Sequence, residues 1–473
     1  MTEGGRRNSF FVGSTTPTGA DPTKNGPEVR RRRLLQAGLA TTASVAIGGR
    51  TAGAGAQTSP AQPGAGPYGS LEGRSADANG IVLPEGFRSR VLARSGETVE
   101  GTELTWHPNP DGGAIFPATG DGGNGWVYVS NSESGEGDGG VGALRFGADG
   151  EVTEAYPILS GTRRNCAGGP TPWGTWLSCE EVDDGQVFEC DPAASGQGEV
   201  RPALGSFSHE AVAVDPDDRK LYLTEDQSDG RLYRFTPDSW PDLGSGPLEV
   251  AVVAEDTSVT WSAVPDPGAE GTPTRQQVPD STAFAGGEGI WYDDGVVFFT
   301  TKFDNRVHVL DVAEQRLEVL YDAALLDDPP LTGVDNVVVS ASGDLLVAED
   351  GGNMQLVLIT PERAVSPLLR IEGQDGSEIA GPAFDPSGTR LYFSSQRGSG
   401  DGGITYEVTG PFRVPATTTT TTPGPTTTLS GLGGEAGDDG DDGGLPVAVP
   451  VGAAAVVAAL MGALAWRRRG ARA

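Results

Sequence analysis

Six short apolar segments recur along the chain at an almost constant interval, and this repeat restricts the fold more than any other feature. Each segment alternates aromatic or β-branched residues with small ones, as in "VYVSNSE" at 127–133 and "LYFSSQRG" at 391–398. Their middle residues lie 48, 46, 76, 48 and 46 residues apart and are Tyr128, Trp176, Tyr222, Phe298, Leu346 and Tyr392. A period of roughly 40 to 50 residues is that of four-stranded propeller blades. The spacing predicts an all-β, six-bladed β-propeller, because the alternative, a pair of β-sandwiches, would not produce a constant interval.

The residues around these segments support the same interpretation. Another short strand and a Gly/Asp turn precede each one, as in "EAVAVDPDDRKLYLTED", and further strands follow. The long third interval contains an insertion, "DTSVTWSAVPDPGAEGTPTRQQVPD". We expect the propeller to occupy residues 75–412.

The N-terminal residues 1–56 predict export. Four arginines at 30–33 precede a weakly apolar stretch, and Ala54 and Ala56 form an A-x-A cleavage site. This pattern is typical of a twin-arginine signal, which makes the twin-arginine translocase a partner. Since such substrates cross the membrane folded, a cofactor loaded inside the cell is expected. The alternative, a basic tail before an anchor helix, is weaker because the apolar run is short for a membrane span.

The C-terminal residues predict an anchor. Residues 445–466 carry no charge and are followed by three arginines in the tail 467–473. A run of about 20 apolar residues spans a bilayer and a positive flank stays in the cytoplasm, so we expect a transmembrane helix with the propeller outside the cytoplasmic membrane. Residues 415–444, rich in Thr/Pro and then Asp/Gly, predict a disordered stalk.

The charge of the chain excludes one class of partner. Its formal net charge is −32, and lysine occurs only at Lys24, Lys220 and Lys302. Nucleic-acid binding is not expected, because few basic groups are available to contact phosphates. The acidity fits a saline habitat, divalent-cation binding or simply a solvated, mutually repelling surface.

Equivalent positions of a propeller form rings around its channel, and potential metal ligands fall on such positions. The first strand of each blade lines the channel, and 10 to 12 residues before the middle residues of the second strands stand Cys166, Glu210, Glu288 and Asp335. A second set, three to five residues after those middle residues, comprises Glu133, Glu181, Glu225 and Glu349. Converging carboxylates cannot all stay ionised without a cation. The register therefore predicts bound metal, although each acid alone could equally lie in a solvent-facing turn or a strand-end hydrogen bond.

The cysteines and histidines refine this hypothesis. Cys179 and Cys190 flank a predicted hairpin and are candidates for a cross-strand disulfide. That leaves Cys166 as either an inert buried thiol or a metal ligand, and a thiolate favours a transition metal whereas carboxylates favour Ca²⁺, Mg²⁺ or Fe³⁺. His209 either orients Glu210 or packs in the core, and we expect structural roles for His107 and His308. No Ser/His/Asp constellation is evident, because "GTWLSCEE" lacks the G-x-S-x-G elbow, and we find no P-loop and no dinucleotide fingerprint in its strand-to-helix context.

The motif "NCAGGPTPWGTWLSCEE" at 165–181, together with "SHEAVAVDP", "GGEGIWYDDG" and "DNVVVSASGDLLVAEDG", resembles the PhoX family of exported alkaline phosphatases and the uncharacterised proteins that share its domain. The resemblance covers most of residues 75–412. It implies a six-bladed propeller whose channel holds ferric and calcium ions, with Cys166 as the thiolate bridging the irons and Glu181 as a shared ligand. By the same resemblance, further metal ligands would be Glu210, Glu288 and Asp335, and Glu133 would match the acid of an N-H-E element that has Ser132 in place of histidine.

One departure from the family bears on activity. Family phosphatases carry an arginine two residues before the glutamate that matches Glu288, where paired donors can clamp phosphate, and this chain has Gly286. Arg163, Arg164 or Lys302 could substitute, but nothing in the sequence places them in the channel. The expected function is a surface-anchored, metal-dependent hydrolase of small phosphate esters whose nucleophile derives from the metal. The alternatives are a non-catalytic calcium-binding propeller for adhesion or ligand capture and a calcium-dependent lactonase-like hydrolase.

Overall fold

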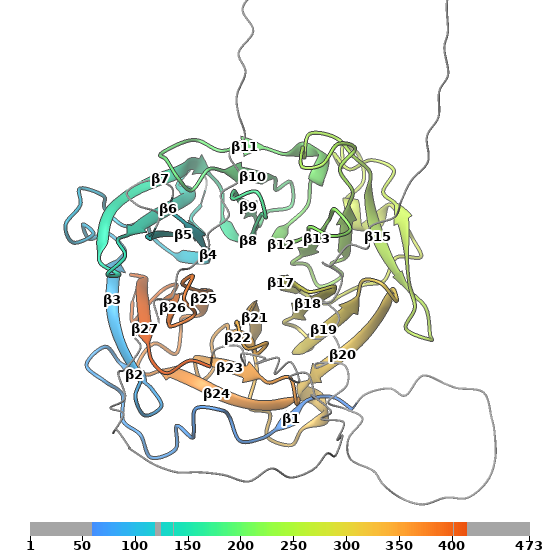
Figure 1. Cartoon of the computed structure of the whole chain (residues 1–473). Helices are drawn as coiled ribbons and strands as arrows, with labels where there is room; N and C mark the ends of the chain where they lie inside the picture. The colour runs from blue at the N-terminus through green and yellow to red at the C-terminus, as the bar shows by residue number, and fades with distance from the viewer. Residues whose placement is uncertain (1–58, 119–123, 136, 401, 414–473) are drawn as a thin grey trace, which may run out of the picture. The chain divides into compact units, whose positions relative to one another are not determined.

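Six sheets, antiparallel except where β1 joins β24, surround a common axis in the computed structural model, which describes residues 59–118, 124–135, 137–400 and 402–413 (Figure 1). Blade 1 consists of β4 (Pro110–Pro117), β5 (Trp126–Ser132), β6 (Gly139–Phe146) and β7 (Val152–Thr162). Blade 2 consists of β8 (Asn165–Pro170), β9 (Trp176–Glu180), β10 (Val187–Cys190) and β11 (Glu199–Val200). Blade 3 consists of β12 (His209–Asp215), β13 (Lys220–Glu225), β14 (Leu232–Phe235), β15 (Leu248–Val253) and β16 (Val259–Ala263).

The remaining blades follow in chain order. Blade 4 consists of β17 (Gly287–Asp293), β18 (Val296–Thr301), β19 (Arg306–Asp311) and β20 (Arg316–Asp322). Blade 5 consists of β21 (Val334–Val339), β22 (Leu345–Glu349), β23 (Gln355–Ile359) and β24 (Ala364–Ile371), and β24 also pairs with β1 (Gln62–Pro63) and β2 (Ile81–Val82). Blade 6 consists of β25 (Ile379–Phe384), β26 (Arg390–Ser395), β27 (Ile404–Thr409) and β3 (Arg88–Arg94).

The predicted six-bladed, all-β architecture is confirmed. All six recurrent segments form the second strands of their blades, and the first strands β4, β8, β12, β17, β21 and β25 surround the axis (Figure 1). The insertion in the long third interval supplies the extra strand β16 and the short 3₁₀ helix η3 (Thr274–Gln276). The ring closes where the N-terminal strand β3 pairs with β27 near the other end of the described chain. Backbone hydrogen bonds within one blade thus join the two ends of the propeller and close the ring.

The blades pack face to face through apolar side chains that alternate along each strand. In β13, Leu221 and Leu223 pack with Leu177 of blade 2, whereas Tyr222 packs with Phe299 of blade 4. Successive residues of a strand point to opposite faces, so a strand between two neighbouring blades needs apolar residues on both faces. This requirement explains why the second strands read as nearly continuous apolar runs.

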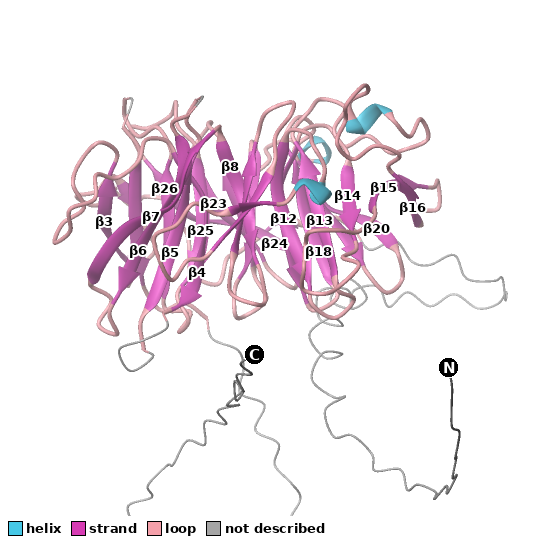
Figure 2. Ribbon diagram, turned by 90° about the horizontal axis from the view of Figure 1, so that it is seen from above, coloured by secondary structure: helices cyan, strands magenta, loops and turns pink. Residues whose placement is uncertain are grey.

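The strands run between two rims (Figure 2). We name the rim at which the first strands begin and the second strands end the entry rim; the 3₁₀ helices η2 (Pro202–Leu204), η3 and η4 (Ala323–Leu325) lie there. The last described residue, Arg413, lies at the opposite rim, where it pairs with Asp344 directly before β22 begins.

Small residues let the first strands approach one another below the entry rim. A Cβ atom at Gly289 of β17 would lie 2.6 Å from Asn336 Cα of β21. We therefore expect Gly289→Ala to lower the free energy of unfolding by about 3 kcal/mol, the upper end of the usual overpacking cost, in chemical denaturation. Gly376→Ala, where no atom lies within 4 Å of the added methyl group, is the control and should leave stability nearly unchanged. Equal stability of the two variants would contradict this packing.

The predicted disulfide is wrong. Cys179 pairs in register with Val187 and Cys190 pairs with Trp176, and both thiols are free and buried. The two cysteines are thus offset by three residues along the β9–β10 ladder, about 10 Å, which exceeds the reach of a disulfide.

The predicted export signal, stalk, membrane helix and basic tail lie outside the described residues. Among the residues that the structure describes, no helix is both long and apolar enough to cross a bilayer.

Candidate metal centre

Five blades place a potential metal ligand at a β-bulge directly after the first residue of the inner strand. In each of these blades the pairing with the second strand shifts at this point. A bulge re-aims a side chain, here toward the channel. The residues, which we name the inner ring, are Asp111, Cys166, Glu210, Glu288 and Asp335. In blade 6 the shift falls one residue later, after Ala380, and that blade adds no ligand to the ring.

A second set of side chains surrounds the inner ring at the entry rim. These residues directly follow the second strands, and we name them the outer ring: Glu133, Glu181, Asp226, Lys302, Asp350 and Gln396. Since all six occupy the same position in their blades, the propeller symmetry brings them together although they are up to 263 residues apart, as for Gln396 and Glu133.

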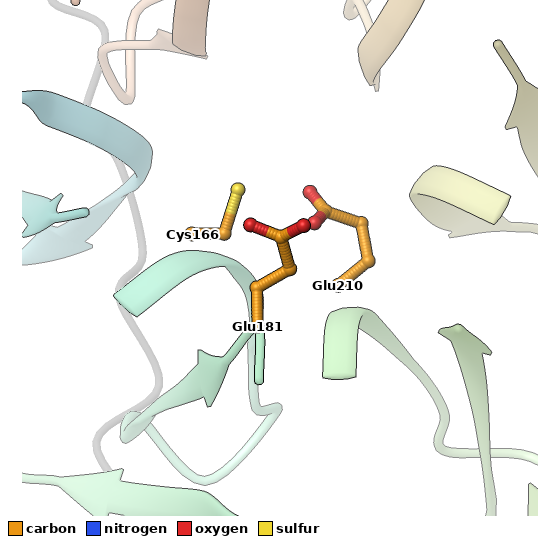
Figure 3. Close-up of side chains that lie close together, drawn as sticks. All are labelled: Cys166, Glu181 and Glu210. Carbon is orange, nitrogen blue, oxygen red and sulfur yellow. The ribbon is translucent and has the colours of Figure 1, made fainter. Parts of the chain in front are cut away.

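The two rings, together with Glu378 directly before β25, bring ligand atoms together in three groups. The first joins Cys166, Glu181 and Glu210, whose sulfur and carboxylate oxygens converge (Figure 3). The second and third groups are Glu210 with Glu288 and Asp335, and Asp111 with Glu133 and Glu378. Within each group the ligand atoms lie within 4.8 Å of one another. Of the six predicted ligands, the structure therefore gathers four around a fifth, Glu210, and places Glu133 in the third group.

Glu210 provides the strongest indication of a cation site. Its side chain is completely buried, and neither carboxylate oxygen has a hydrogen-bond partner. Buried polar atoms are nearly always paired, and an unpaired buried carboxylate is costly. Burial raises the pKa of Glu210 well above its ordinary value, and the neighbouring Glu288 raises it further. A multivalent cation would supply the partner that these oxygens lack, so the residues fit a metal centre.

The pKa values of the neighbouring candidate ligands are raised as well. Burial raises the pKa of the Cys166 thiol, and repulsion by Asp111 and Glu210 adds to the effect. Burial also raises the pKa of Glu181 to about 7, with Glu133 adding to the rise and Arg164 opposing it. The pKa of Asp335 is likewise raised to about 7 by burial and then by Asp350. Without a cation, this channel holds its protons; with one, the thiolate and carboxylates can ionise.

Two of the basic residues considered from the sequence lie at the rings. Arg164 bridges the outer-ring acids Glu133 and Glu181, at 2.9 Å from the latter. Lys302 Nζ lies 2.7 Å from Glu288 Oε1 and 3.0 Å from Asp226 Oδ2.

Arg163 instead pairs beside the ring, at 3.1 Å from Asp184. Gly286, which stands where the family has arginine, has φ +70°, and a Cβ there would lie 2.9 Å from the Phe303 ring. This backbone conformation favours glycine, and a side chain at this position would collide with Phe303.

Glu225 and Glu349 of the predicted second set do not join the metal groups. Each accepts a hydrogen bond from the backbone six residues later, at Arg231 (3.2 Å) and Gln355 (2.9 Å). Glu180 makes the equivalent bond to the backbone of Gln186, at 3.2 Å. These glutamates secure the loop after the second strand, and the residue that follows each one belongs to the outer ring.

The three histidines have structural positions. His209 stacks on Phe207 with ring centroids 3.6 Å apart, and its Nε2 lies 3.1 Å from the Gly205 carbonyl, so it does not orient Glu210. His308 Nε2 contacts Thr301 Oγ1 at 3.0 Å, and His107 Nε2 contacts Ser130 Oγ at 3.2 Å.

Sequence reasoning missed Asp111, Asp226, Asp350 and Glu378. Asp111 lies 17 residues before Tyr128 instead of 10 to 12, because the first hairpin is longer in blade 1. A usable signal was present: a glycine or alanine follows the inner-ring residue in "DG", "CA", "EA" and "EG", where the strands approach closely. Asp226 and Asp350 were obscured by the glutamates that precede them.

The entry rim is hollowed beside the first metal group. A hollow of about 660 Å³ is lined by Arg164, Glu181, Asp226 and Phe303, among others. The Phe303 side chain is 58% exposed, which is unusual for a large apolar residue of this protein. Of the first metal group, Glu181 borders this hollow, so a small molecule in it would lie beside the group.

Comparison with known proteins agrees with the sequence resemblance. The model of the family described as alkaline phosphatase PhoX matches residues 137–187 and 183–323. The structure of Pseudomonas fluorescens PhoX in complex with vanadate, a transition state analogue, superposes with a TM-score of 0.58 at 15% identity, covering 71% of this chain and 97% of that one. A gluconolactonase from Xanthomonas campestris gives a TM-score of 0.45 at 14% identity, covering 75% of this chain and 100% of that one. No curated protein matches the chain in sequence.

Proposed function

From the premise that this chain resembles the PhoX family of alkaline phosphatases, we propose that it is a metal-dependent hydrolase of small phosphate esters. The matched family model spans the motifs of the first metal group. The observation that carries the proposal is the unpaired, fully buried carboxylate of Glu210 beside Cys166 and Glu181. A structural acidic cluster would have satisfied these oxygens with donors from the chain, as it does at Glu225.

The candidate ligands would form two metal sites. Cys166, Glu181 and Glu210 would hold one metal site, and Asp111, Glu133 and Glu378 a second, with Glu288 and Asp335 on the far side of Glu210. Bound multivalent cations would neutralise the phosphate oxygens and lower the pKa of a coordinated water. Thiolate together with carboxylates fits iron at the first site, and carboxylates alone fit calcium at the second.

Arg164 is placed to receive the anionic substrate. Its side chain is 48% exposed at the hollow while it contacts Glu133 and Glu181, so its guanidinium borders both metal groups. A guanidinium offers paired donors to phosphate oxygens. Arg164 therefore takes over the positioning that an arginine at Gly286 would provide. The side chain of Phe303 faces the same hollow and would exclude water from the substrate.

We further propose twin-arginine export and anchoring of the propeller outside the cytoplasmic membrane. These proposals rest on the sequence patterns at residues 1–56 and 445–473.

The full chain, purified after export and loaded with iron and calcium, should hydrolyse phosphomonoesters. Cys166→Ser should lower kcat/KM at least about 100-fold and release bound iron, because a hard hydroxyl replaces a soft thiolate ligand. Elemental analysis and a phosphate-release assay check both effects. Cys190→Ser, at a buried thiol outside the metal groups, is the control and should retain iron. Iron-loaded wild type without activity on any phosphate ester would exclude the proposal.

Gly286 favours a second candidate, a non-catalytic calcium-binding propeller. Its left-handed conformation favours glycine, so an arginine clamp at this position would be strained. Calcium alone in the exported protein, with no iron and no hydrolysis, would identify this function.

A further inference from the structure

Lys302 interrupts the otherwise acidic or neutral outer ring. The equivalent residue is an acid in blades 1, 2, 3 and 5 and a glutamine in blade 6, as the outer ring defined above shows. Blade 4 alone places a cation at this position, and the sequence contains only three lysines in all. The lysine therefore occupies a point where the propeller geometry normally directs a carboxylate into the channel.

The local structure holds this ammonium between two neighbouring blades. Lys302 Nζ contacts Glu288 of its own blade at 2.7 Å and Asp226 of blade 3 at 3.0 Å. The Lys302 backbone N–H donates to the Gly286 carbonyl at 2.8 Å. A Cβ at Gly286 would lie 3.1 Å from Lys302 Cγ, so the glycine leaves room for the lysine stem.

The carboxylates around the lysine have capacity for a further cation. Glu210, Glu288 and Asp335 bring ligand oxygens within 4.8 Å of one another. Glu210 is fully buried, contributes one of these oxygens and has no hydrogen-bond partner at either oxygen, and Asp226 Oδ1 is also buried without one. Calcium takes six to eight oxygen ligands at about 2.3–2.6 Å. A calcium ion bound to Glu288 would therefore lie within a few ångströms of the ammonium, and the two cations would repel each other strongly.

We propose that the ammonium of Lys302 takes the place of a divalent cation at the junction of blades 3 and 4, and that removing it opens a further calcium site formed by Glu210, Glu288, Asp335 and Asp226. This inference rests on the proposed metal centre, which it confines to the Cys166 side of Glu210. Because the lysine neutralises Glu288, Glu210 is available as a metal ligand in the group that contains Cys166.

The test compares bound metal in the purified full chain and two variants after equilibration with excess calcium and removal of free ions. Lys302→Met keeps the length and apolar stem of the side chain and removes the charge. It should bind about one calcium ion per chain more than wild type. Lys302→Arg keeps the charge and should bind the same number as wild type. Lys220→Met, at a lysine paired with Asp218 outside the two rings, controls for general effects of losing a lysine.

Thermal unfolding supplies a second readout that does not depend on activity. Chelation should lower the melting temperature of Lys302→Met more than that of wild type, because Glu288 and Asp226 then face each other without any cation. Added calcium should restore the variant.

If Lys302→Met binds no more calcium than wild type and gains no extra stabilisation from it, the inference is wrong and the lysine coexists with the metals. The proposed metal centre is judged separately by the wild type itself. A wild type without bound metal refutes that centre, even if Lys302→Met acquires an ion. A variant too unstable to purify is replaced by Lys302→Gln, to which the same criteria apply.

Discussion

Replacing Glu210 by glutamine should abolish most of the activity while making the metal-free protein more stable. The amide has nearly the same shape as the carboxylate but cannot neutralise a cation. Since replacement of residues that merely support a metal ligand costs about 10- to 100-fold, loss of a shared direct ligand should lower kcat/KM at least about 100-fold. The loss should be accompanied by weaker metal binding in a competition assay with a chelator.

The opposite effect on the metal-free protein follows from the pKa of Glu210. Its buried carboxyl binds a proton more tightly in the folded chain than in the unfolded one, so between the ordinary and the raised pKa folding takes up a proton. Each unit of raised pKa costs about 1.4 kcal/mol under these conditions. Glutamine avoids this cost, and the variant should unfold at higher denaturant concentration than wild type when both are chelated.

Glu225 offers a matched control in the same blade. Its side chain is also completely buried, but it accepts hydrogen bonds from Tyr233 at 2.8 Å and from the Arg231 backbone at 3.2 Å. Glu225→Gln should destabilise the protein modestly with or without metal and leave metal affinity unchanged. Parallel behaviour of the two glutamine variants would show that Glu210 is an ordinary structural acid.

Chelation should make the stability of the wild-type protein fall steeply as the pH rises from 5 to 8. Burial raises the pKa of Asp335 and of Glu181 to about 7, and it raises the pKa values of Glu210 and Glu288 well above their ordinary range. A raised carboxyl pKa means that the folded chain binds more protons than the unfolded chain between the ordinary and the raised pKa. Stability therefore declines with rising pH across this window and levels off above the folded-state pKa.

Bound metal should remove most of this decline, because cations stabilise the ionised ligands. Glu225 and Glu349 also have a pKa raised to about 7 by burial, but they lie outside the metal groups and contribute equally in both samples. The difference between melting temperatures with and without chelator at each pH therefore reports only the ionisation of the residues in the metal groups. This difference should be small at pH 5 and amount to on the order of 10 °C at pH 8, from a few kcal/mol in total. A difference that is independent of pH would contradict the proposed ionisation.

The fold could be predicted because each blade produces its own recognisable segment in the sequence. Each blade must bury both faces of its second strand, so an apolar run recurs once per blade and the interval alone identifies the architecture. The inner-ring residues Cys166, Glu210, Glu288 and Asp335 could be predicted for the same reason, since their hairpins have nearly equal lengths.

What could not be predicted depends on features that vary between blades. The longer hairpin of blade 1 moved Asp111 out of register, and Glu378 precedes its inner strand. The disulfide prediction failed because the order of residues in a hairpin does not reveal its pairing register. Lys302 was recognised only as a possible phosphate ligand, since its two acidic partners come from separate blades and meet only when the ring closes.

The pairing of Arg413 with Asp344 fixes where the chain leaves the propeller, at the rim opposite the metal groups. Immobilising the propeller through a linkage placed directly after Arg413 should therefore leave the hollow at the entry rim open to small molecules.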